Sequence, residues 1–463
     1  MKSTTRNIQH LFLRAGFSEN PSTVKQQLNL SIEQIVDRLF QSSNTSTDLN
    51  YLPDPLHGRD EEVSSVKVLL MILKSKKQLR ELNLAWLDKM VSSREQLREK
   101  MTFFWHNHFA TSVPFAYLMQ VQNNTLRKHA LGKFSDLLHA VAKDPAMIIY
   151  LNNQQNKKNA PNENFAREVM ELFTLGIGNY TEHDIREAAR AFTGWTVNLK
   201  GKFEFVKGDH DFGEKEFMGR KGNFSGEDIL NILLDNPQVA EFVVTKIYRE
   251  FVNDIVDEQR VNKLAEEFLN SGYDISALMR KIFTSEWFFY PENIGVKIAS
   301  PVELIVRYRK LLAFEFKRKK YMLSAQDLLG QVLFFPPNVS GWKGGQQWID
   351  SSTLLLRMNL PQYALLGASP DLRPKQEFDN ESVEEEVEEK KIKITTDWSA
   401  LINECSGKNG WEIDEILLQS LLQCDTKDID INLLHNHTDS FTDERRVISF
   451  STAIMSLPEF QLI

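Results

Sequence analysis

Neither glycine nor proline occurs between residues 59 and 113. Within that stretch, apolar residues recur every three to four positions from Leu82 to Phe104. Because glycine and proline are the main breakers of helices, their absence together with this period predicts long helices. The same period recurs at residues 31–40 and over most of residues 226–290. We therefore expect a mainly α protein built as a large multi-helical globular domain.

One segment departs from the helical period directly after Trp195. From Val197 to Phe205, apolar and polar residues alternate on both sides of Lys200-Gly201. Alternation around a central glycine is typical of two antiparallel strands joined by a turn. The sequence therefore predicts a small β-hairpin insertion near residues 196–220.

Charge is distributed unevenly along the chain. The formal net charge is −8, and eight acidic residues with no basic one lie between Gln376 and Glu389. Elsewhere the acidic and basic residues balance, which argues against nucleic-acid binding through a broad basic face. The acidic run is too polar to form a packed core of its own. We expect a main helical domain (1–374), an acidic disordered insertion (375–396) and a C-terminal helical segment (397–463) that closes the fold.

The sequence carries few signs of an oxidising or membrane environment. It has only two cysteines, Cys405 and Cys424, which do not have the spacing of a metal or redox motif. It has no apolar run long enough to cross a membrane and no N-terminal signal-peptide pattern. We therefore expect a cytoplasmic protein, with a periplasmic location or export together with a partner as the alternative.

Residues 161–195 concentrate the charged residues most suited to chemistry. Helical spacing places Glu163, Arg167, Glu168 and Glu171 on one face of a first helix, opposite an apolar face. A second helix should begin at Thr181, which with Asp184 has the spacing of a capping box. Its polar face carries the remaining charges, which are His183, Arg186, Glu187 and Arg190.

These two polar faces predict an acid–base site. A glutamate can transfer a proton, and an arginine can hold an anionic group by two hydrogen bonds. The predicted catalytic residues are Glu163, Arg167, Glu168, Glu171 and Arg190, and the predicted substrate-binding residues on the same helices are Asn164 and Arg186. The alternative is that both faces are solvated and that their ion pairs contribute under about 1 kcal/mol each.

A metal site is the second hypothesis. His106 and His108 could chelate a divalent metal together if their segment were extended, whereas a regular helix would set them about 200° apart. His210 and Asp211, in a glycine-flanked loop, could complete a mixed nitrogen and oxygen ligand set. The alternative is that His106 and His108 lie at the edge of the core among aromatic residues and bond to the backbone.

A constrained loop at residues 336–345 carries a third candidate surface. Two prolines precede three glycines, Trp342 lies within the loop, and Trp348 follows it. Tryptophans on such loops are typical of sugar or peptide contact surfaces and equally of hydrophobic plugs. Trp342 and Trp348 are therefore predicted substrate-binding residues with a structural alternative.

Several stretches together resemble one known family. They are NENFAREVMELFTLGIGNYTEHDIREAARAFTGW, HLFLRAGF, FWHNHF, LRKHALGKFSDLLHAVAKDPAMIIYLNN, HDFGEKEFMG, KIASPVELIV and FFPPNVSGWKGGQQWIDSSTLLLRMN. They resemble, in order and over nearly the whole chain, the uncharacterised bacterial family catalogued as domain of unknown function 1800. That family has no settled activity. Its members are often encoded beside domain of unknown function 1501, so the resemblance implies a sulfatase- or phosphatase-like partner.

Three functions follow from these observations. The chain lacks the sequence motifs of P-loop nucleotide binding, Rossmann dinucleotide binding, serine hydrolases and HExxH metalloproteases. The first function is a metal- or acid/base-dependent hydrolase acting on an anionic envelope glycan or peptide. The second is a non-catalytic helical scaffold or maturation partner of the sulfatase-like protein, and the third is a carbohydrate-binding module.

Overall fold

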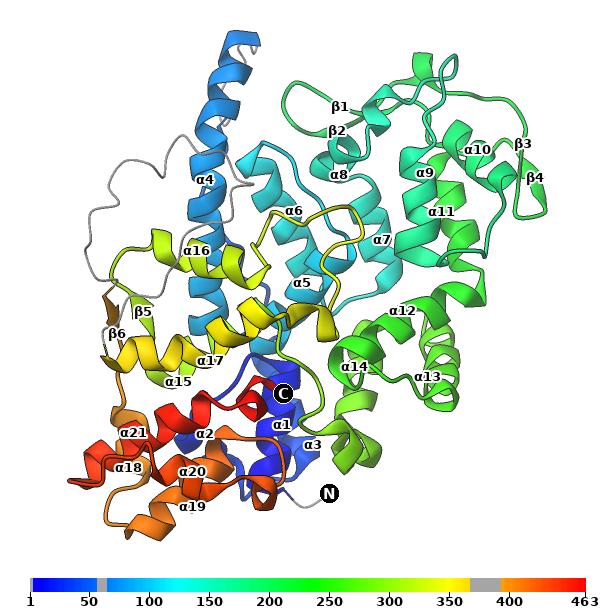
Figure 1. Cartoon of the computed structure of the whole chain (residues 1–463). Helices are drawn as coiled ribbons and strands as arrows, with labels where there is room; N and C mark the ends of the chain where they lie inside the picture. Colours follow the sequence, from blue (N-terminus) through cyan, green and yellow to red (C-terminus); the bar gives the residue numbers. More distant parts are fainter. Residues whose placement is uncertain (1–2, 56–64, 367–392) are drawn as a thin grey trace.

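The computed structural model describes residues 3–55, 65–366 and 393–463 (Figure 1). It is mainly helical, at 61%, which confirms the predicted fold class. The helices are α1 (Thr5–Ala15), α2 (Pro21–Gln27), α3 (Ile32–Ser42), α4 (Ser65–Ser92), α5 (Gln96–His108), α6 (Ala116–His129), α7 (Phe134–Ala142), α8 (Pro145–Tyr150), α9 (Asn164–Glu168), α10 (Glu182–Ala191), α11 (Gly226–Leu234), α12 (Pro237–Phe251), α13 (Glu258–Asn270), α14 (Ile275–Thr284), α15 (Pro301–Leu312), α16 (Lys320–Leu329), α17 (Ser351–Leu366), α18 (Ser399–Glu404), α19 (Gly410–Leu421), α20 (Ile431–His435) and α21 (Asp443–Met455).

The stretch without glycine or proline forms two of these helices, α4 and α5. Side-chain hydrogen bonds mark the end of α4 and the start of α5. Ser93 Oγ accepts the Glu95 N–H at 3.0 Å, and Gln96 Nε2 donates to the Met90 carbonyl at 3.1 Å. Serine competes for backbone groups in this way, so it separates helices without a glycine or a proline.

Helix α5 lies between two hydrophobic cores. Met101 and Trp105 pack into the first core, which helices α1, α3 and α6 to α14 supply. Phe103 packs into the second core, which α4, α15 to α17 and the C-terminal helices supply. Every residue of α5 except Asn107 is buried. The charged side chains of α5 must therefore find partners inside the protein.

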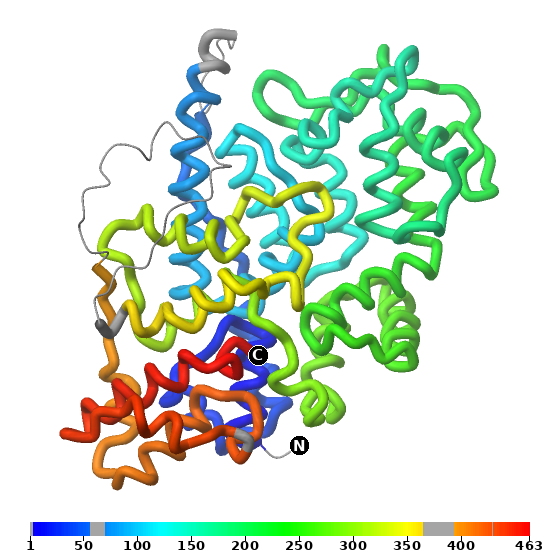
Figure 2. The backbone as a smooth tube through the Cα atoms, viewed as in Figure 1, coloured from blue at the N-terminus to red at the C-terminus, as the bar shows by residue number. Residues whose placement is uncertain are grey.

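The two ends of the described chain pack together, as the adjacent blue and red-orange parts of the tube show (Figure 2). Arg6 Nη2 donates to the Gln423 carbonyl at 2.9 Å, and Gln9 Nε2 donates to the Ser420 carbonyl at 2.9 Å. Further along, the Ile463 N–H donates to the Lys297 carbonyl at 2.8 Å. The last helices thus cover α1 and the segment that leads into α15.

The strands of the described residues are short and form two-stranded antiparallel sheets. The predicted β-hairpin is confirmed as β1 (Trp195–Val197) paired with β2 (Phe203–Phe205), with Thr196 opposite Glu204. A second hairpin in the same stretch pairs β3 (Lys215–Phe217) with β4 (Arg220–Gly222).

The predicted acidic insertion, residues 375–396, falls mainly outside the described residues. Only residues 393–396 of that range are described. Within them, β6 (Ile394–Thr395) pairs with β5 (Glu315–Phe316). The end of the range that we expected to be disordered is therefore a strand. Over the described parts of the chain, the helices are too short or too polar to span a membrane.

Candidate functional site

The first helix of the predicted site is not a regular α-helix. It runs as α9 for one turn and continues as a π-helix, Val169–Thr174. The Leu175 N–H donates to the carbonyl of Met170, five residues back, at 2.8 Å. Our prediction of one regular helix is corrected here. Single π-turns within helices are frequent at functional sites.

Side chains from other helices explain this local geometry. Lys246 Nζ of α12 donates to the Leu172 carbonyl at 3.0 Å, and His108 Nε2 of α5 lies 3.2 Å from the Phe173 carbonyl. Thr174 Oγ1 donates to the Val169 carbonyl at 2.6 Å. The Leu172 and Phe173 carbonyls at the end of the π-helix and the Val169 carbonyl at its start thus accept hydrogen bonds from side chains, so the backbone need not keep the α-helical pattern there.

The two central glutamates lie in different surroundings. Both are half-buried. Glu171 accepts a 2.5 Å hydrogen bond from the Tyr180 hydroxyl. Burial and then the negative charge of Glu171 raise the pKa of Glu168, against the opposing effect of Arg167. Burial and the bond to Glu171 raise the pKa of Tyr180 to about 12, so that hydroxyl stays a donor at neutral pH.

The arginines of the hairpin are engaged by carboxylates. Arg167 bonds Glu182 through Nη1 at 2.8 Å and Nη2 at 2.9 Å, and its Nη2 is 3.3 Å from Glu163. Arg190 bonds Glu187, and its Nε bonds Asp211 at 2.7 Å. The charges of the hairpin are therefore distributed over two ion-pair groups, one at Arg167 and one at Arg190.

The other hairpin residues of the predicted site lie at the surface. Asn164, the first residue of α9, and Arg186 on α10 are both exposed. The capping box predicted at the start of α10 is present, with Asp184 N–H donating to Thr181 Oγ1 at 3.1 Å. Asn164 and Arg186 thus remain free to contact a ligand from solvent.

The predicted metal ligands do not converge. His106 and His108 lie in the regular helix α5, so they face different sides. His106 is 1% exposed, packs against Trp86 and Phe334, and accepts the Phe334 N–H on Nε2 at 3.1 Å. Burial lowers the pKa of His106 to about 3. His106 therefore stays neutral inside an aromatic cluster.

The remaining predicted ligands also have other roles. His108 packs among aromatic rings and contacts the π-helix, and burial lowers its pKa. His210 Nδ1 lies 2.8 Å from the Thr193 carbonyl, and Asp211 pairs with Arg190. Among the described residues, His, Cys, Asp and Glu side chains form no group of three that could hold a metal ion. The structure therefore gives the predicted metal set no support.

The two tryptophans of the third candidate surface are buried, although much of the loop around them is exposed. Trp342 and Trp348 are only 6% and 8% exposed. Asn107 Oδ1 accepts the Trp342 N–H at 2.8 Å, and Gly341, at φ +75°, lies where a Cβ would meet Asn107 Oδ1 at 2.2 Å. Glycine is therefore required at 341. Because both indoles are buried, this surface corresponds to the hydrophobic plug among our two predictions.

A buried charged cluster that we did not predict joins five segments. It centres on Glu303 of α15, which forms an ion pair with Lys100 of α5 and accepts the Ser300 N–H at 2.7 Å. The cluster also contains Arg14, Glu250 and Lys297, and Lys297 pairs with Asp254 at the exposed edge of the cluster. The sequence signals were a charged residue within an apolar helical run, as at Arg14, and the capping-box spacing of Ser300 and Glu303.

The two glutamates of this cluster titrate differently. Burial and the charge of Glu303 raise the pKa of Glu250. Burial alone would raise the pKa of Glu303 as well, but the Lys100 ammonium and the hydrogen bonds from Lys100 and Ser300 lower it. Of these two glutamates, Glu250 therefore holds a proton more readily than Glu303.

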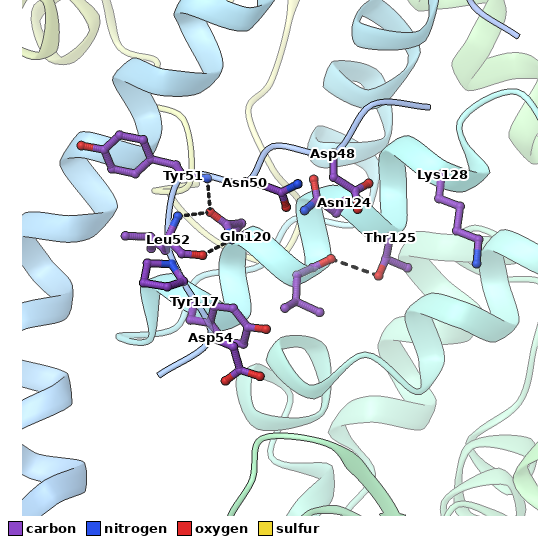
Figure 3. A pocket seen from close by; sticks show the side chains of 12 residues that line it. Asp48, Asn50, Tyr51, Leu52, Asp54, Tyr117, Gln120, Asn124, Thr125 and Lys128 are labelled. Atoms are coloured by element: carbon purple, nitrogen blue, oxygen red, sulfur yellow. Dashed lines mark hydrogen bonds between the residues drawn. The ribbon is translucent and has the colours of Figure 1, made fainter. Parts of the chain in front are cut away.

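A polar groove of about 690 Å³ lies elsewhere, between residues 48–54 and α6 (Figure 3). The Gln120 amide fixes one wall, since Oε1 accepts the N–H groups of Tyr51 and Leu52 at 3.0 and 2.7 Å. Asn124 Oδ1 accepts the Leu49 N–H at 2.8 Å. None of the residues that we predicted as site residues lines this groove.

Fold and site together define a mainly helical protein. It has two half-buried glutamates where α9 continues into the π-helix, and a cluster of charged residues between two cores. The chain belongs to the family described as Protein of unknown function (DUF1800), which matches residues 10–462. Comparisons with curated proteins and with solved structures gave no significant match.

Proposed function

We propose that this protein is a hydrolase in which Glu168 and Glu171 act as an acid–base pair on an anionic glycan or peptide of the cell envelope. The observation that supports this most is the raised pKa of Glu168, caused by burial and by the neighbouring carboxylate. Two carboxyl groups whose surroundings separate their proton affinities are a recurring arrangement in enzymes that cleave polar bonds.

The proposed roles of Glu168 and Glu171 follow from the different surroundings of their carboxyl groups. Protonated Glu168 donates its proton to the leaving oxygen or nitrogen as the substrate bond breaks. Glu171, which accepts a hydrogen bond from the Tyr180 hydroxyl, takes the proton from the attacking water. One water is consumed, both products leave, and the two carboxyl groups return to their starting states by proton exchange with solvent.

The surface around the pair fits an anionic substrate. Arg186 is exposed on the neighbouring helix, and Arg167 is partly exposed beside Glu168. Glu182 engages Arg167 through two hydrogen bonds, so a carboxylate or sulfate of the substrate would compete for this contact. Asn164, the first residue of α9, adds an exposed side-chain amide.

The test is hydrolysis of peptidoglycan, uronic-acid polymers, sulfated polysaccharides and peptides by the whole chain, with products measured by mass spectrometry. We expect turnover of one class, reduced about 100-fold or more in Glu168→Gln and Glu171→Gln. Glu182→Gln is the control, because it removes an exposed carboxylate of the same hairpin that takes no part in proton transfer. This variant should still turn over the substrate. Equal turnover by Glu168→Gln and wild type, or no turnover of any class, would refute the proposal.

A direct titration makes the test independent of the substrate. In protein with labelled glutamate, Glu171→Gln should lower the pKa of Glu168, because the repelling charge is removed. Arg167→Gln should raise it, because the attracting charge is removed. A Glu168 titration that neither substitution moves would show that the two carboxyl groups do not act as a pair.

The second candidate is a non-catalytic scaffold or maturation partner for a sulfatase- or phosphatase-like protein of the family domain of unknown function 1501. The pairing of Arg167 with Glu182 and of Arg190 with Glu187 favours it, because such pairs fix a helix hairpin. Co-purification of the two proteins, unaffected by Glu168→Gln, would support this role, and their failure to bind would argue against it.

A further inference from the structure

The polar groove beside α6 lies outside the proposed hydrolase site (Figure 3). One wall is the segment from Asp48 to Asp54, and the other is α6 from Tyr117 to Lys128. Among the described residues, none from α9, the π-helix or α10 lines it. Its volume of about 690 Å³ is that of a typical site for a small ligand. The groove therefore offers a separate place at which the protein can bind a ligand.

The α6 wall of the groove is one long face of a single helix. Tyr117, Val121, Thr125 and Lys128 all line the groove. They follow one another at intervals of three or four positions, which places them in one row along the helix. At 1.5 Å per residue, the row is about 16 Å long. A groove of this length suits an elongated ligand built from several linked units.

Side chains of α6 hold the opposite wall in place. Asn124 accepts the Leu49 N–H at 2.8 Å and donates to the Leu49 carbonyl at 3.3 Å. Gln120 bonds Leu52 in the same way, accepting its N–H at 2.7 Å and donating to its carbonyl at 2.8 Å. The segment is thus fixed to α6 at two points one helical turn apart. A ligand that enters the groove does not have to order this wall first, which favours binding.

Three polar side chains of the groove remain available to a ligand. Asp48, Asn50 and Lys128 are exposed, and within the described residues their side chains form neither a hydrogen bond nor an ion pair. They supply a carboxylate that accepts hydrogen bonds, an amide that accepts and donates, and an ammonium that donates. Figure 3 shows Asp48 and Lys128 toward one end of the groove and Tyr117 with Asp54 toward the other. The polar groups thus lie along its length.

Tyr117 supplies an aromatic ring at its end of the groove. The side chain is half-buried, and its hydroxyl donates a hydrogen bond to Asp54. This bond holds the ring in one orientation. Pro53 and Val121 add apolar surface to the lining. An aromatic ring fixed in this way can pack against an apolar face of a ligand whose other edges are polar.

The charge and polarity of the lining select the class of ligand. Asp48 and Asp54 are acidic, whereas Lys128 is basic, so the described lining carries a small excess of negative charge. This excess disfavours a polyanion such as a nucleic acid or a sulfated glycan. The many polar side chains also disfavour an apolar ligand, because it would leave them without hydrogen bonds. A neutral sugar meets both conditions, since its hydroxyl groups donate and accept and its C–H face is apolar.

We infer that this groove binds a neutral oligosaccharide, with the Tyr117 ring packed against one sugar unit and Asp48, Asn50 and Lys128 hydrogen-bonded to hydroxyl groups of the units further along. The sequence placed a carbohydrate surface at Trp342 and Trp348, which are buried, whereas this groove is lined by exposed side chains. The groove holds a glycan chain without cleaving it. The inference does not depend on hydrolysis at Glu168 and Glu171.

The first experiment measures binding by isothermal titration calorimetry. The whole chain, carrying Glu168→Gln so that the proposed hydrolase site cannot consume a ligand, is titrated with neutral tetrasaccharides of N-acetylglucosamine, glucose and mannose. We expect one of these sugars to bind with a dissociation constant between about 10 μM and 1 mM. Absence of binding by all of them at about 5 mM would overturn the inference, whether or not the hydrolase proposal holds.

The second experiment locates the binding site. Asn50→Ala removes an exposed amide without touching the core, and it should weaken binding about 5-fold or more. Asn403→Ala, which removes an exposed asparagine of α18, is the matched control and should bind like the parent protein. Tyr117→Leu removes the aromatic ring and should weaken binding about 10-fold. Its circular dichroism spectrum shows whether the variant is folded.

Two results would contradict this location or this class of ligand. Equal binding by Asn50→Ala, Asn403→Ala and the parent protein would show that the sugar binds elsewhere. Titration with a mixture of extended peptides tests the other class of elongated polar ligand. Binding of peptides but of no tetrasaccharide, weakened by Asn50→Ala, would show that the groove takes a peptide and would overturn the sugar assignment.

Discussion

Individual buried residues in this protein have their protonation set by their surroundings. His106 accepts a backbone N–H among aromatic rings, and its pKa falls to about 3 because the charged form would lose its hydration. Burial has the opposite effect on an acid. Asp144, the N-cap of α8, is 3% exposed, and burial raises its pKa to about 7 although it accepts the Ala146 and Met147 N–H groups.

Asp144→Asn tests this effect. The folded-state pKa of about 7 lies above the unfolded value of about 4, so ionisation of Asp144 reduces stability as pH rises through this interval. Asparagine is an equally good N-cap and carries no charge. We expect the variant to be more stable than wild type by roughly 1–3 kcal/mol at about pH 8, with a much smaller difference at about pH 4.

The measurement is the free energy of unfolding at both pH values. His106 adds an opposite trend, since its depressed pKa makes both proteins less stable as pH falls from about 6.5 toward 3. Comparison of variant and wild type at the same pH cancels this contribution. A stability difference independent of pH would show that Asp144 does not carry a raised pKa.

Among the elements, the π-helix Val169–Thr174 shows how neighbours decide local geometry. Its sequence predicts a regular amphipathic helix, and its apolar face is buried as expected. The Lys246 and His108 side chains, from helices distant in the sequence, form hydrogen bonds with carbonyl groups at its end. The carboxylate of Glu171 is thus positioned by α5 and α12 as well as by its own helix.

Lys246→Met should loosen this element. Methionine retains most of the apolar stem but cannot donate to the Leu172 carbonyl. The lysine is half-buried, and burial lowers its pKa to about 8. We expect amide hydrogens of residues 169–176 to exchange about 10-fold faster in the variant, as measured by mass spectrometry. Lys263→Met, on the exposed face of α13, is the matched control. Unchanged exchange in Lys246→Met would show that the π-helix is set by its own sequence.

At the scale of the whole molecule, α5 joins two hydrophobic cores through buried charge. Glu99 bonds Arg127 Nε at 2.7 Å and the Trp86 indole at 2.9 Å, and Lys100 pairs with Glu303. Motifs far apart in the sequence meet here, from Arg14 in α1 to Glu303 in α15. Through these bonds α5 is joined to α6 of the first core and to α4 and α15 of the second.

Glu303→Gln should destabilise the fold strongly. It leaves the Lys100 ammonium, 1% exposed, without its counter-charge, which costs about 3–5 kcal/mol. Lys100→Met combined with Glu303→Gln removes both charges and should recover most of the loss. Denaturant unfolding of the single and double variants measures the coupling. If the double variant were as unstable as the sum of the single ones, the pair would not be coupled.

Local features of this protein were determined by the sequence itself. The helical period of α4 and α5, the capping box of Thr181 and Asp184, and the alternation that forms β1 and β2 depend only on residues close along the chain. A family resemblance was also legible in the sequence, and it is confirmed over residues 10–462.

Contacts between distant segments were decided only by the tertiary structure. The sequence showed histidines, glutamates and arginines but not which of them would meet. It could not show that His108 would contact a carbonyl of the π-helix, that Trp342 would pack on Asn107, or that Glu303 would collect Lys100. The physical reason is that helix periods and caps arise from interactions over three to four residues, whereas burial of a charge and its choice of partner depend on which faces the packed cores bring together.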